Sequence, residues 1–340
     1  MTSKELVKNA IQGEKTPRPA CAPLATFFCA ADEGISLQEF TMNPDVQVDC
    51  ILRYHEKYRP DAVWVSVDTW VTAQAMGATV FSPLGDQPLT GSPEGFIDSA
   101  QDLDRIPGPD PYSRGRQPLQ LEVLSRVVET LGKETFVVGC FDQSPFSLAC
   151  QALGMASLMT RIIEDRSLVA DLLGKCLEHA LAYAEAMAAC GADMLSTGDS
   201  PASLLGPDLY SSVALPWEQK LFSRLSERKD TVLSLHICGD TTSILPSMAG
   251  SGAHVLEIDH LVDIGDAFTL LGDQIALWGN IDPVRVLLNG NTSDVRDAVT
   301  GLLNAVESAP GRRFVLSSGC ILAPETPPEN VQTFFSTARA

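Results

Sequence analysis

The sequence has no apolar run that approaches the ~18 residues that a membrane-spanning helix needs. It also has no internal repeat, no low-complexity tract and no clear linker. No G-x-G-x-x-G or Walker A sequence follows any segment that we predict to be a strand, which argues against a nucleotide-binding sheet. Residues 1–6 predict the start of an amphipathic helix and not the apolar core of a signal peptide. We therefore expect a protein that does not enter a membrane.

Basic residues are scarce relative to acidic ones. Lys and Arg number 24 against 43 Asp and Glu, so the formal net charge is −19. Nucleic acids and anionic membrane surfaces attract basic proteins, so we expect neither as a partner. The hydrophobic content of 45% and the charged content of 20% are ordinary for a globular chain.

The nine cysteines show no disulfide pattern, because their number is odd and their spacing is irregular. Most of them lie in apolar or Ala-rich surroundings, where cysteine usually acts as a small buried hydrophobic residue. We therefore expect a reduced, cytoplasmic protein.

Strand-like apolar runs alternate with helical stretches along the chain. Because parallel strands need crossover connections, this alternation predicts a parallel sheet. Eight units over about 300 residues match an α/β fold, the (β/α)8 TIM barrel, as one domain over residues 1–340. An open, doubly wound sheet is the alternative. The eight predicted strands are residues 22–28, 62–67, 135–139, 193–196, 232–236, 255–258, 275–278 and 314–317.

The segments outside the strands complete this prediction. An N-terminal helical extension precedes the barrel, and residues 81–119, rich in Pro and Gly, form an irregular insertion after the second strand. Insertions of that length are usually lids or cavity walls. Helices are predicted at residues 167–189, 206–225 with a kink at Pro216, 241–250 and 292–309.

Residues with metal-binding side chains follow two of the predicted strands, at the end where barrel enzymes have their active sites. His236 and Cys238 end the fifth strand, and side chains at i and i+2 share a face. Cys320 follows the eighth strand. Either motif alone is more often structural, but one His and two Cys together suit zinc and leave a fourth position open. Water there would make a hydrolase, whereas a thiol there would lose its proton; we favour the thiol.

Three carboxylates are candidates for orienting a substrate or for taking the fourth zinc position. Asp199 follows the fourth predicted strand, and Glu257 and Asp259 end the sixth. Helix capping is the competing role for the aspartates. Comparable positions after other strands hold Asp68, Asp142, Asn280 and Asp282.

The order of several motifs resembles the uroporphyrinogen decarboxylase superfamily, and more narrowly its zinc branch, the methylcobamide:coenzyme M methyltransferases. The resemblance covers about residues 4–337. The matching stretches include His236-Ile237-Cys238-Gly239-Asp240-Thr241-Thr242, Gly198-Asp199-Ser200-Pro201, Glu257-Ile258-Asp259, Trp278-Gly279-Asn280-Ile281-Asp282 and Gly319-Cys320.

The resemblance implies a (β/α)8 barrel in which His236, Cys238 and Cys320 bind Zn²⁺. It also implies a methylated corrinoid on a small partner protein and a thiol such as coenzyme M as methyl acceptor. It leaves the direction open, since related proteins move methyl groups from methoxy, methylamine or similar donors onto cob(I)alamin. It leaves a homodimer open as well.

Two departures from the family limit the choice of substrate. Residues 19–28 contain no Arg, whereas the decarboxylase branch has an Arg-rich motif there for substrate carboxylates; porphyrinogen decarboxylation is therefore the weaker alternative. No residue is identified for the sulfonate of coenzyme M. Arg105, Arg114 and Arg285 are the only loose candidates, and solvation at the surface is the simpler role for each.

Overall fold

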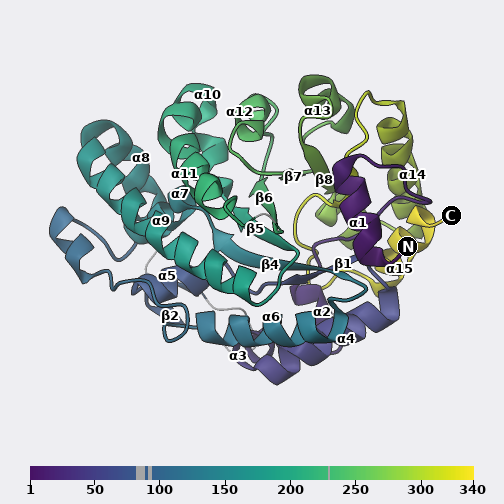
Figure 1. Ribbon diagram of the computed structural model, residues 1–340, viewed down its shortest axis with the longest axis horizontal. Helices are drawn as coiled ribbons and strands as arrows, with labels where there is room; N and C mark the ends of the chain where they lie inside the picture. The colour runs from purple at the N-terminus through teal and green to yellow at the C-terminus, as the bar shows by residue number, and fades with distance from the viewer. Residues whose placement is uncertain (82–88, 91–93, 229) are drawn as a thin grey trace.

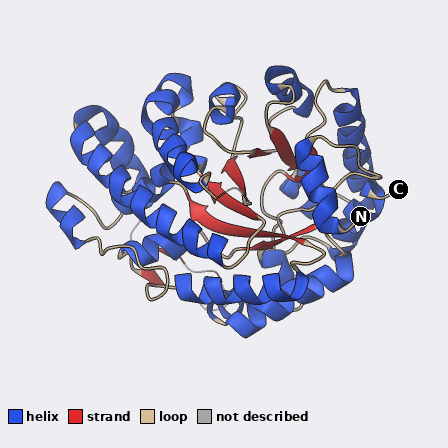
Figure 2. Cartoon of the chain, viewed as in Figure 1, coloured by secondary structure: helices blue, strands red, loops and turns tan. Residues whose placement is uncertain are grey.

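The computed structural model describes residues 1–81, 89–90, 94–228 and 230–340. Its centre is a parallel sheet in the strand order β1-β4-β5-β6-β7-β8-β9, surrounded by helices (Figures 1 and 2). This is the α/β, TIM-barrel-like arrangement that the alternation of strands and helices predicted. The strands are β1 Ala62–Val65, β4 Phe136–Gln143, β5 Met194–Gly198, β6 Val232–Ile237, β7 Val255–Ile258, β8 Ala276–Ile281 and β9 Phe314–Ser318.

The first predicted strand, residues 22–28, is wrong. In its place, a short extended segment at residues 20–22 makes one parallel bridge, between Cys21 and Leu316 of β9. Its other edge accepts a hydrogen bond from the Asp61 N–H, next to β1, at the Cys21 carbonyl (3.0 Å). The segment thus lies between the first and last strands of the sheet. It cannot extend into a strand because Pro23 has no N–H, and the apolar residues beyond it begin helix α2 at Phe27.

The other seven predicted strands are present, and so is the predicted helical periphery. The helix predicted at 292–309 spans residues 292–308 and is capped by Asn291. The segment predicted as helix 241–250 is helical only at 245–249. The helices are α2 Phe27–Ala31, α3 Leu37–Met42, α4 Pro44–Tyr58, α5 Val71–Met76, α6 Gln117–Leu131, α7 Pro145–Leu153, α8 Met155–Glu164, α9 Arg166–Ala189, α10 Gly206–Leu209, α11 Leu215–Leu225, α12 Leu245–Ala249, α13 Ile264–Leu271, α14 Thr292–Ser308 and α15 Pro328–Ala338.

Shorter helical turns interrupt this pattern. A π-helical segment, Tyr210–Ala214, joins α10 to α11, and Pro216 lies in the first turn of α11. The predicted helix 206–225 is therefore helical throughout, as α10, the π-helical segment and α11 in succession. A kink at Pro216 stays a prediction. The remaining turns are η1 Ala100–Arg105, η2 Ser200–Leu204 and η4 Pro283–Leu288.

The predicted insertion at 81–119 contains a two-stranded hairpin, of β2 Val80–Phe81 and β3 Leu89–Thr90, followed by η1. Residues 82–88 and 91–93 of this insertion lie outside the described residues. Among the described residues, no single helix is long and apolar enough to cross a membrane; α7 and α8, bent by 106°, pass that test only as a pair.

The N-terminal helix α1, Ser3–Gln12, packs into the interior of the sheet. Its buried side chains are Leu6, Val7, Ala10 and Ile11. They form one cluster with inward residues from the strands, including Trp64, Phe136, Met194, Val255 and Trp278. Lys4 Nζ anchors the helix to Asp193 Oδ1 (2.8 Å), at the start of β5. The predicted extension is thus part of the core, and it covers the end of the sheet where the strands begin.

Truncation of this helix tests that role. Leu6→Ala is expected to lower the free energy of unfolding by about 2–5 kcal/mol, because a buried leucine loses its contacts and leaves a cavity. Chemical denaturation measures the change. Gln12→Ala, at an exposed position of the same helix, is the matched control and should change it by less than about 0.5 kcal/mol. Equal effects of the two changes would show that α1 is not part of the core.

Candidate metal centre and its cavity

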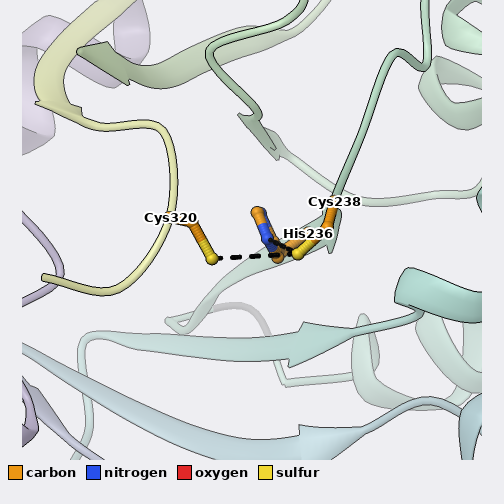
Figure 3. A group of neighbouring side chains, drawn as sticks. All are labelled: His236, Cys238 and Cys320. Atoms are coloured by element: carbon orange, nitrogen blue, oxygen red, sulfur yellow. Dashed lines mark hydrogen bonds between the residues drawn. The ribbon is translucent and has the colours of Figure 1, made fainter. Parts of the chain in front are cut away.

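His236, Cys238 and Cys320 meet at one point beyond the carboxyl ends of the strands (Figure 3). His236 belongs to β6, Cys238 follows it directly, and Cys320 lies two residues after β9. The ligand atoms of the three side chains all lie within 4.8 Å of one another. The structure therefore brings together the three residues predicted to bind a metal, although 82 positions separate the two cysteines.

Two glycines allow the backbone to present the cysteines. Gly239 has φ 96°, a left-handed conformation that turns the chain immediately after Cys238. At Gly319, a Cβ atom would lie 2.5 Å from the backbone nitrogen of His260, so only glycine lets the Cys320 loop approach β7 so closely.

The imidazole of His236 is oriented from its far side. Its Nδ1 lies 2.9 Å from the carbonyl oxygen of Glu257, which fixes Nδ1 as the protonated nitrogen and leaves Nε2 facing the cysteines. Nε2 is 2.9 Å from Cys238 Sγ. A histidine that donates its second N–H to a carbonyl is the usual arrangement around a bound metal.

The distance between the two sulfurs fits a tetrahedral zinc site. Two thiolates at ~2.3 Å from zinc in tetrahedral geometry lie about 3.8 Å apart. The Sγ atoms of Cys238 and Cys320 are 3.8 Å apart. The Nε2–Sγ distance to His236 is a hydrogen-bond length, shorter than the ~3.5 Å of a tetrahedral N–Zn–S pair, so the imidazole would move outward slightly on binding.

The three side chains also shift one another's pKa. The hydrogen bond with Cys320 and the contact with His236 lower the pKa of Cys238 to about 3, against the opposing effect of burial. Burial lowers the pKa of His236, but Cys238 outweighs it and raises that pKa to about 9. The hydrogen bond to Cys238, and then burial, raise the pKa of Cys320. The two shifts favour a thiolate at Cys238 paired with a protonated His236, and a metal ion would take the place of the proton between them.

The metal centre borders a cavity of about 170 Å³ inside the mouth of the barrel. The floor includes Trp64, whose ring packs edge-on against Trp278 with centroids 6.0 Å apart, above the cluster that contains α1. The remaining lining comes from the residues before α2 and from the carboxyl ends of the strands: Leu24, Thr26, Ser66, Val67, Thr69, Cys140, Asp142, Gln143, Ser196, Thr197, Gly198, Ser200, His236, Cys238, Glu257, Cys320 and Ile321.

Of the three predicted carboxylates, only Glu257 lines this cavity. Its Oε1 accepts hydrogen bonds from the hydroxyls of Ser196 (2.7 Å) and Ser234 (2.5 Å). Burial raises the pKa of Glu257, although His236 and the two serines act in the opposite direction. Glu257 therefore contributes to the site twice, through its carbonyl to His236 and through its carboxyl group to the cavity.

Asp259 supports the loops around the metal centre. Its Oδ2 accepts a hydrogen bond from the Gly239 N–H (3.0 Å), and its Oδ1 accepts one from the Leu261 N–H (2.9 Å). His260 Nδ1 lies 2.9 Å from the same Oδ1. Asp259 thus ties the turn after Cys238 to the end of β7, a positioning contact. A direct role in catalysis stays a prediction.

Asp199 is fully buried and does not line the cavity. Its Oδ1 accepts hydrogen bonds from the Ser147 N–H (2.8 Å) and hydroxyl (2.7 Å), which cap α7. On its other side lies a second buried carboxyl group, Glu218, which accepts a hydrogen bond from Tyr210 (2.6 Å). Asp199 thus contacts the N-terminal turn of α7, which is close to the helix-capping role considered as the alternative for this residue. A catalytic role for Asp199 stays a prediction.

Other residues at strand ends are partly structural. Asn280 Nδ2 donates to the carbonyls of Asp259 and Val262, and Asp282 caps the turn that follows β8. Arg105 and Arg285 have side chains 80% and 84% exposed, and Arg114 is exposed too; none of the three lines the cavity.

Several cavity residues were not selected from the sequence. The prediction noted Asp142 only as a residue after a strand, and it overlooked Gln143, Trp64 and the serines that contact Glu257. The alternation of side chains along a strand identifies inward positions once the strand register is known. Because the register of β4 shifts between Cys140 and Asp142, the sequence alone did not provide it.

The fold and the site together define a class, the barrel enzymes with a cluster of polar side chains, of types that can bind a metal, at the carboxyl ends of their strands. The family model "Uroporphyrinogen decarboxylase (URO-D)" matches residues 2–340. The chain belongs to this family.

Relatives within the family carry two different activities. The chain is 30% identical over 303 residues to a uroporphyrinogen decarboxylase of Nostoc punctiforme, covering 87% of this chain and 82% of the relative. It is 32% identical over 284 residues to the methylcobamide:CoM methyltransferase MtbA of Methanosarcina acetivorans, covering 82% and 79%. Among solved structures, a methyltransferase from Methanosarcina mazei aligns with a TM-score of 0.89 at 25% identity, covering 100% and 98% of the two chains.

The buried pair of carboxyl groups predicts a pH dependence of stability. Burial raises the pKa of Asp199 from 3.8 to about 6, against the hydrogen bonds from Ser147. The folded protein binds the Asp199 proton more tightly than the unfolded chain does, so protonation of Asp199 stabilises the fold. This contribution to the free energy of unfolding is complete below pH 3.8 and is lost as the pH rises through about 6. Asp199→Asn removes it, so over this range the stability of the wild type should fall relative to the variant by about 1–3 kcal/mol.

Urea unfolding between pH 4 and pH 7 measures that difference. Asp297→Asn, an exposed residue on α14, is the matched control and should run parallel to the wild type. A parallel curve for Asp199→Asn would mean that Asp199 is ionised in the folded protein across the whole range.

Proposed function

We propose that this protein is a zinc-dependent, corrinoid-linked methyltransferase that moves a methyl group between a methylated corrinoid protein and a small thiol. The observation that supports it best is the convergence of His236, Cys238 and Cys320 at the edge of a cavity. One nitrogen and two sulfurs would hold a zinc ion with three protein ligands and so leave a fourth position for a substrate, and the three side chains line a space of about 170 Å³.

The donor set favours thiol chemistry. When bound, a zinc ion holds a thiol in its deprotonated, nucleophilic form at neutral pH. In the overall reaction the thiol sulfur gains the methyl group, the thiol proton leaves, and both electrons of the cobalt–carbon bond stay on cobalt. The thiol is small, because the cavity admits only a small molecule beside the three ligands.

The chain's own residues hold and orient the components. The Glu257 carbonyl fixes the His236 ring, and Asp259 holds the turn after Cys238. The carboxyl group of Glu257 lies in the cavity wall, where it would contact the substrate. We therefore keep Glu257 as the candidate catalytic carboxylate and assign positioning roles to Asp259 and Asp199.

The surface around the cavity suits a corrinoid partner. Exposed apolar side chains follow four of the strands at this end: Leu204 after β5, Leu261 after β7, Val284 after β8 and Ile321 after β9. A contiguous patch of exposed apolar groups is typical of a contact surface, and these four side chains all follow strand ends at the same end of the barrel. The name of the MtbA relatives, methylcobamide:CoM methyltransferase, supports a methylated corrinoid as the group that docks there.

Porphyrinogen decarboxylation is a weaker candidate, despite the similarity to decarboxylases. A substrate with many carboxylates needs cationic partners. Residues 19–28 contain no Arg, and among the described lining residues of the cavity there is no Lys or Arg. Transfer in the opposite direction, from a methoxy or methylamine donor to cob(I)alamin, would use the same metal centre and is separated from the first proposal by assay.

Metal analysis tests the ligands. The wild type, reconstituted and dialysed, is expected to retain one zinc ion per chain, and Cys320→Ala should bind zinc at least about 10-fold more weakly, because a thiolate ligand is lost. Cys140→Ala is the matched control: it removes a cysteine that lines the same cavity but lies outside the cluster of three. Retention of one tightly bound zinc by Cys320→Ala would contradict the assignment.

Anaerobic turnover tests the reaction. With methylcobalamin and a small thiol, the wild type should form cob(I)alamin, and Cys238→Ala should be slower by about 100-fold or more, because the ligand set is incomplete. The absorbance of the cobalamin gives the rate. A panel of methoxy and methylamine donors with cob(I)alamin measures the opposite direction. Turnover of a porphyrinogen by metal-free protein would overturn the proposal.

A further inference from the structure

Outside the three candidate metal ligands, the charged residue types among the described lining residues of the cavity are both carboxylic acids. Asp142 and Glu257 line the cavity, and no Lys or Arg stands among its described lining residues. Residues 82–88 and 91–93, which the structure does not describe, contain no Lys or Arg in their sequence either. A substrate with an anionic tail would therefore meet carboxyl groups and no opposite charge.

The buried arginine beside the cavity does not supply that charge. Arg116 is buried, and both of its terminal nitrogens donate to Asp68, while its Nε donates to Gln74 Oε1 (2.9 Å). The positive charge of Arg116 is thus already neutralised by Asp68, and it does not neutralise Asp142 as well. The three groups together carry one excess negative charge whenever Asp142 is ionised.

Asp142 also has an unused hydrogen-bonding atom. Its Oδ1 accepts a hydrogen bond from Gln143 Nε2 (3.3 Å), whereas its Oδ2 is buried and has no hydrogen-bond partner among the described residues. Two further buried groups in the cavity wall also have no hydrogen-bond partner among the described residues: the Nε1–H of Trp64 and the hydroxyl of Thr26. Burial, and then the charge of Asp68, raise the pKa of Asp142, as expected for a carboxyl group that lacks a counter-charge.

Asp142 and Gln143 line the same cavity as the candidate metal ligands, from strand β4. In the sheet, Gln143 pairs with Gly198 and Gly198 pairs with His236, so Asp142 and Gln143 belong to the strand two positions away from the metal ligands. Two strand spacings put the backbones about 10 Å apart, and side chains that converge inside a barrel shorten that gap. A small molecule with sulfur at one end can therefore reach Asp142 with the other.

We propose that the thiol substrate of this protein carries a hydrogen-bond-donating, cationic tail, such as a protonated amine, which pairs with Asp142, and that sulfonate and carboxylate tails are disfavoured. This inference rests on the proposed function and deepens it, because it names the chemical class of the thiol. An ammonium group donates to the free Oδ2 and supplies the positive charge that the cavity lacks.

Three thiols that share an HS–CH₂–CH₂– unit provide the probe: cysteamine with a cationic tail, 2-mercaptoethanol with a neutral one and 2-mercaptoethanesulfonate with an anionic one. Their affinities are measured on Co²⁺-substituted wild type through the sulfur-to-cobalt absorption band, and kcat/KM is measured with methylcobalamin. We expect cysteamine to bind at least about 10-fold more tightly than the sulfonate, as one charge pair allows. Tighter binding of the sulfonate would overturn the inference.

The same experiment separates the two proposals. If none of the three thiols is methylated, the proposed methyl transfer fails, and the binding series still decides the preference for the tail. If the thiols are methylated but the sulfonate has the highest kcat/KM, the methyl transfer stands and the inference about the tail fails.

Asp142→Asn tests the residue itself. Asp142 has φ 73°, a conformation that asparagine accepts, so the variant should fold. Because the thiols differ in acidity, the quantity compared is the cysteamine-to-sulfonate affinity ratio in each protein. We expect Asp142→Asn to lower that ratio about 10-fold and Asp297→Asn, on exposed α14, to leave it unchanged. An unchanged ratio in Asp142→Asn would mean that another group recognises the tail.

Discussion

The parallel pairing of β6 through β9 is the constraint on which the site depends. His236 pairs with Glu257, Glu257 with Trp278 and Trp278 with Val315, so the carboxyl ends of four strands lie at one edge. In a flat sheet, three strand spacings would put β6 and β9 about 14 Å apart. The sulfurs of Cys238 and Cys320 are nevertheless 3.8 Å apart, because the sheet curves and its inner side chains converge. The same pairing places the Glu257 carbonyl against His236.

The inside of the barrel is divided between stability and chemistry. Below Trp64 and Trp278, apolar side chains fill the interior of the barrel, and some of these side chains come from α1. Above it, the strands carry serine, cysteine and carboxyl groups whose burial is costly unless each has a partner. Glu257 has two serine hydroxyls, whereas Asp142 keeps one oxygen without a partner among the described residues. Polar groups left unsatisfied in a cavity are where a ligand gains most by binding.

Relatives of this chain include both decarboxylases and methyltransferases on one scaffold, so the fold alone does not decide between them. The distinction lies in the side chains at the mouth of the barrel. One imidazole and two thiols are a donor set that suits zinc and other thiophilic metal ions, and this is why we propose a sulfur substrate. A cavity with acidic groups and no described cation in its wall is poorly suited to a molecule with many carboxylates.

The sequence by itself determined the alternation of strands and helices, seven of the eight strands and the three residues that meet at the metal centre. These features are local: apolar runs, caps and polar residues directly after strands are visible without a partner segment. The strand predicted at residues 22–28 was wrong because Pro23 and the helix that begins at Phe27 interrupt an apolar run that resembles a strand. Only the tertiary structure decided that Asp199 lies buried against Ser147, that Asp259 supports a loop and that Asp142 and Gln143 line one cavity with the three candidate metal ligands. The direction of each side chain there depends on strand register and on contacts between residues far apart in the chain, and a single sequence does not encode either in its local pattern.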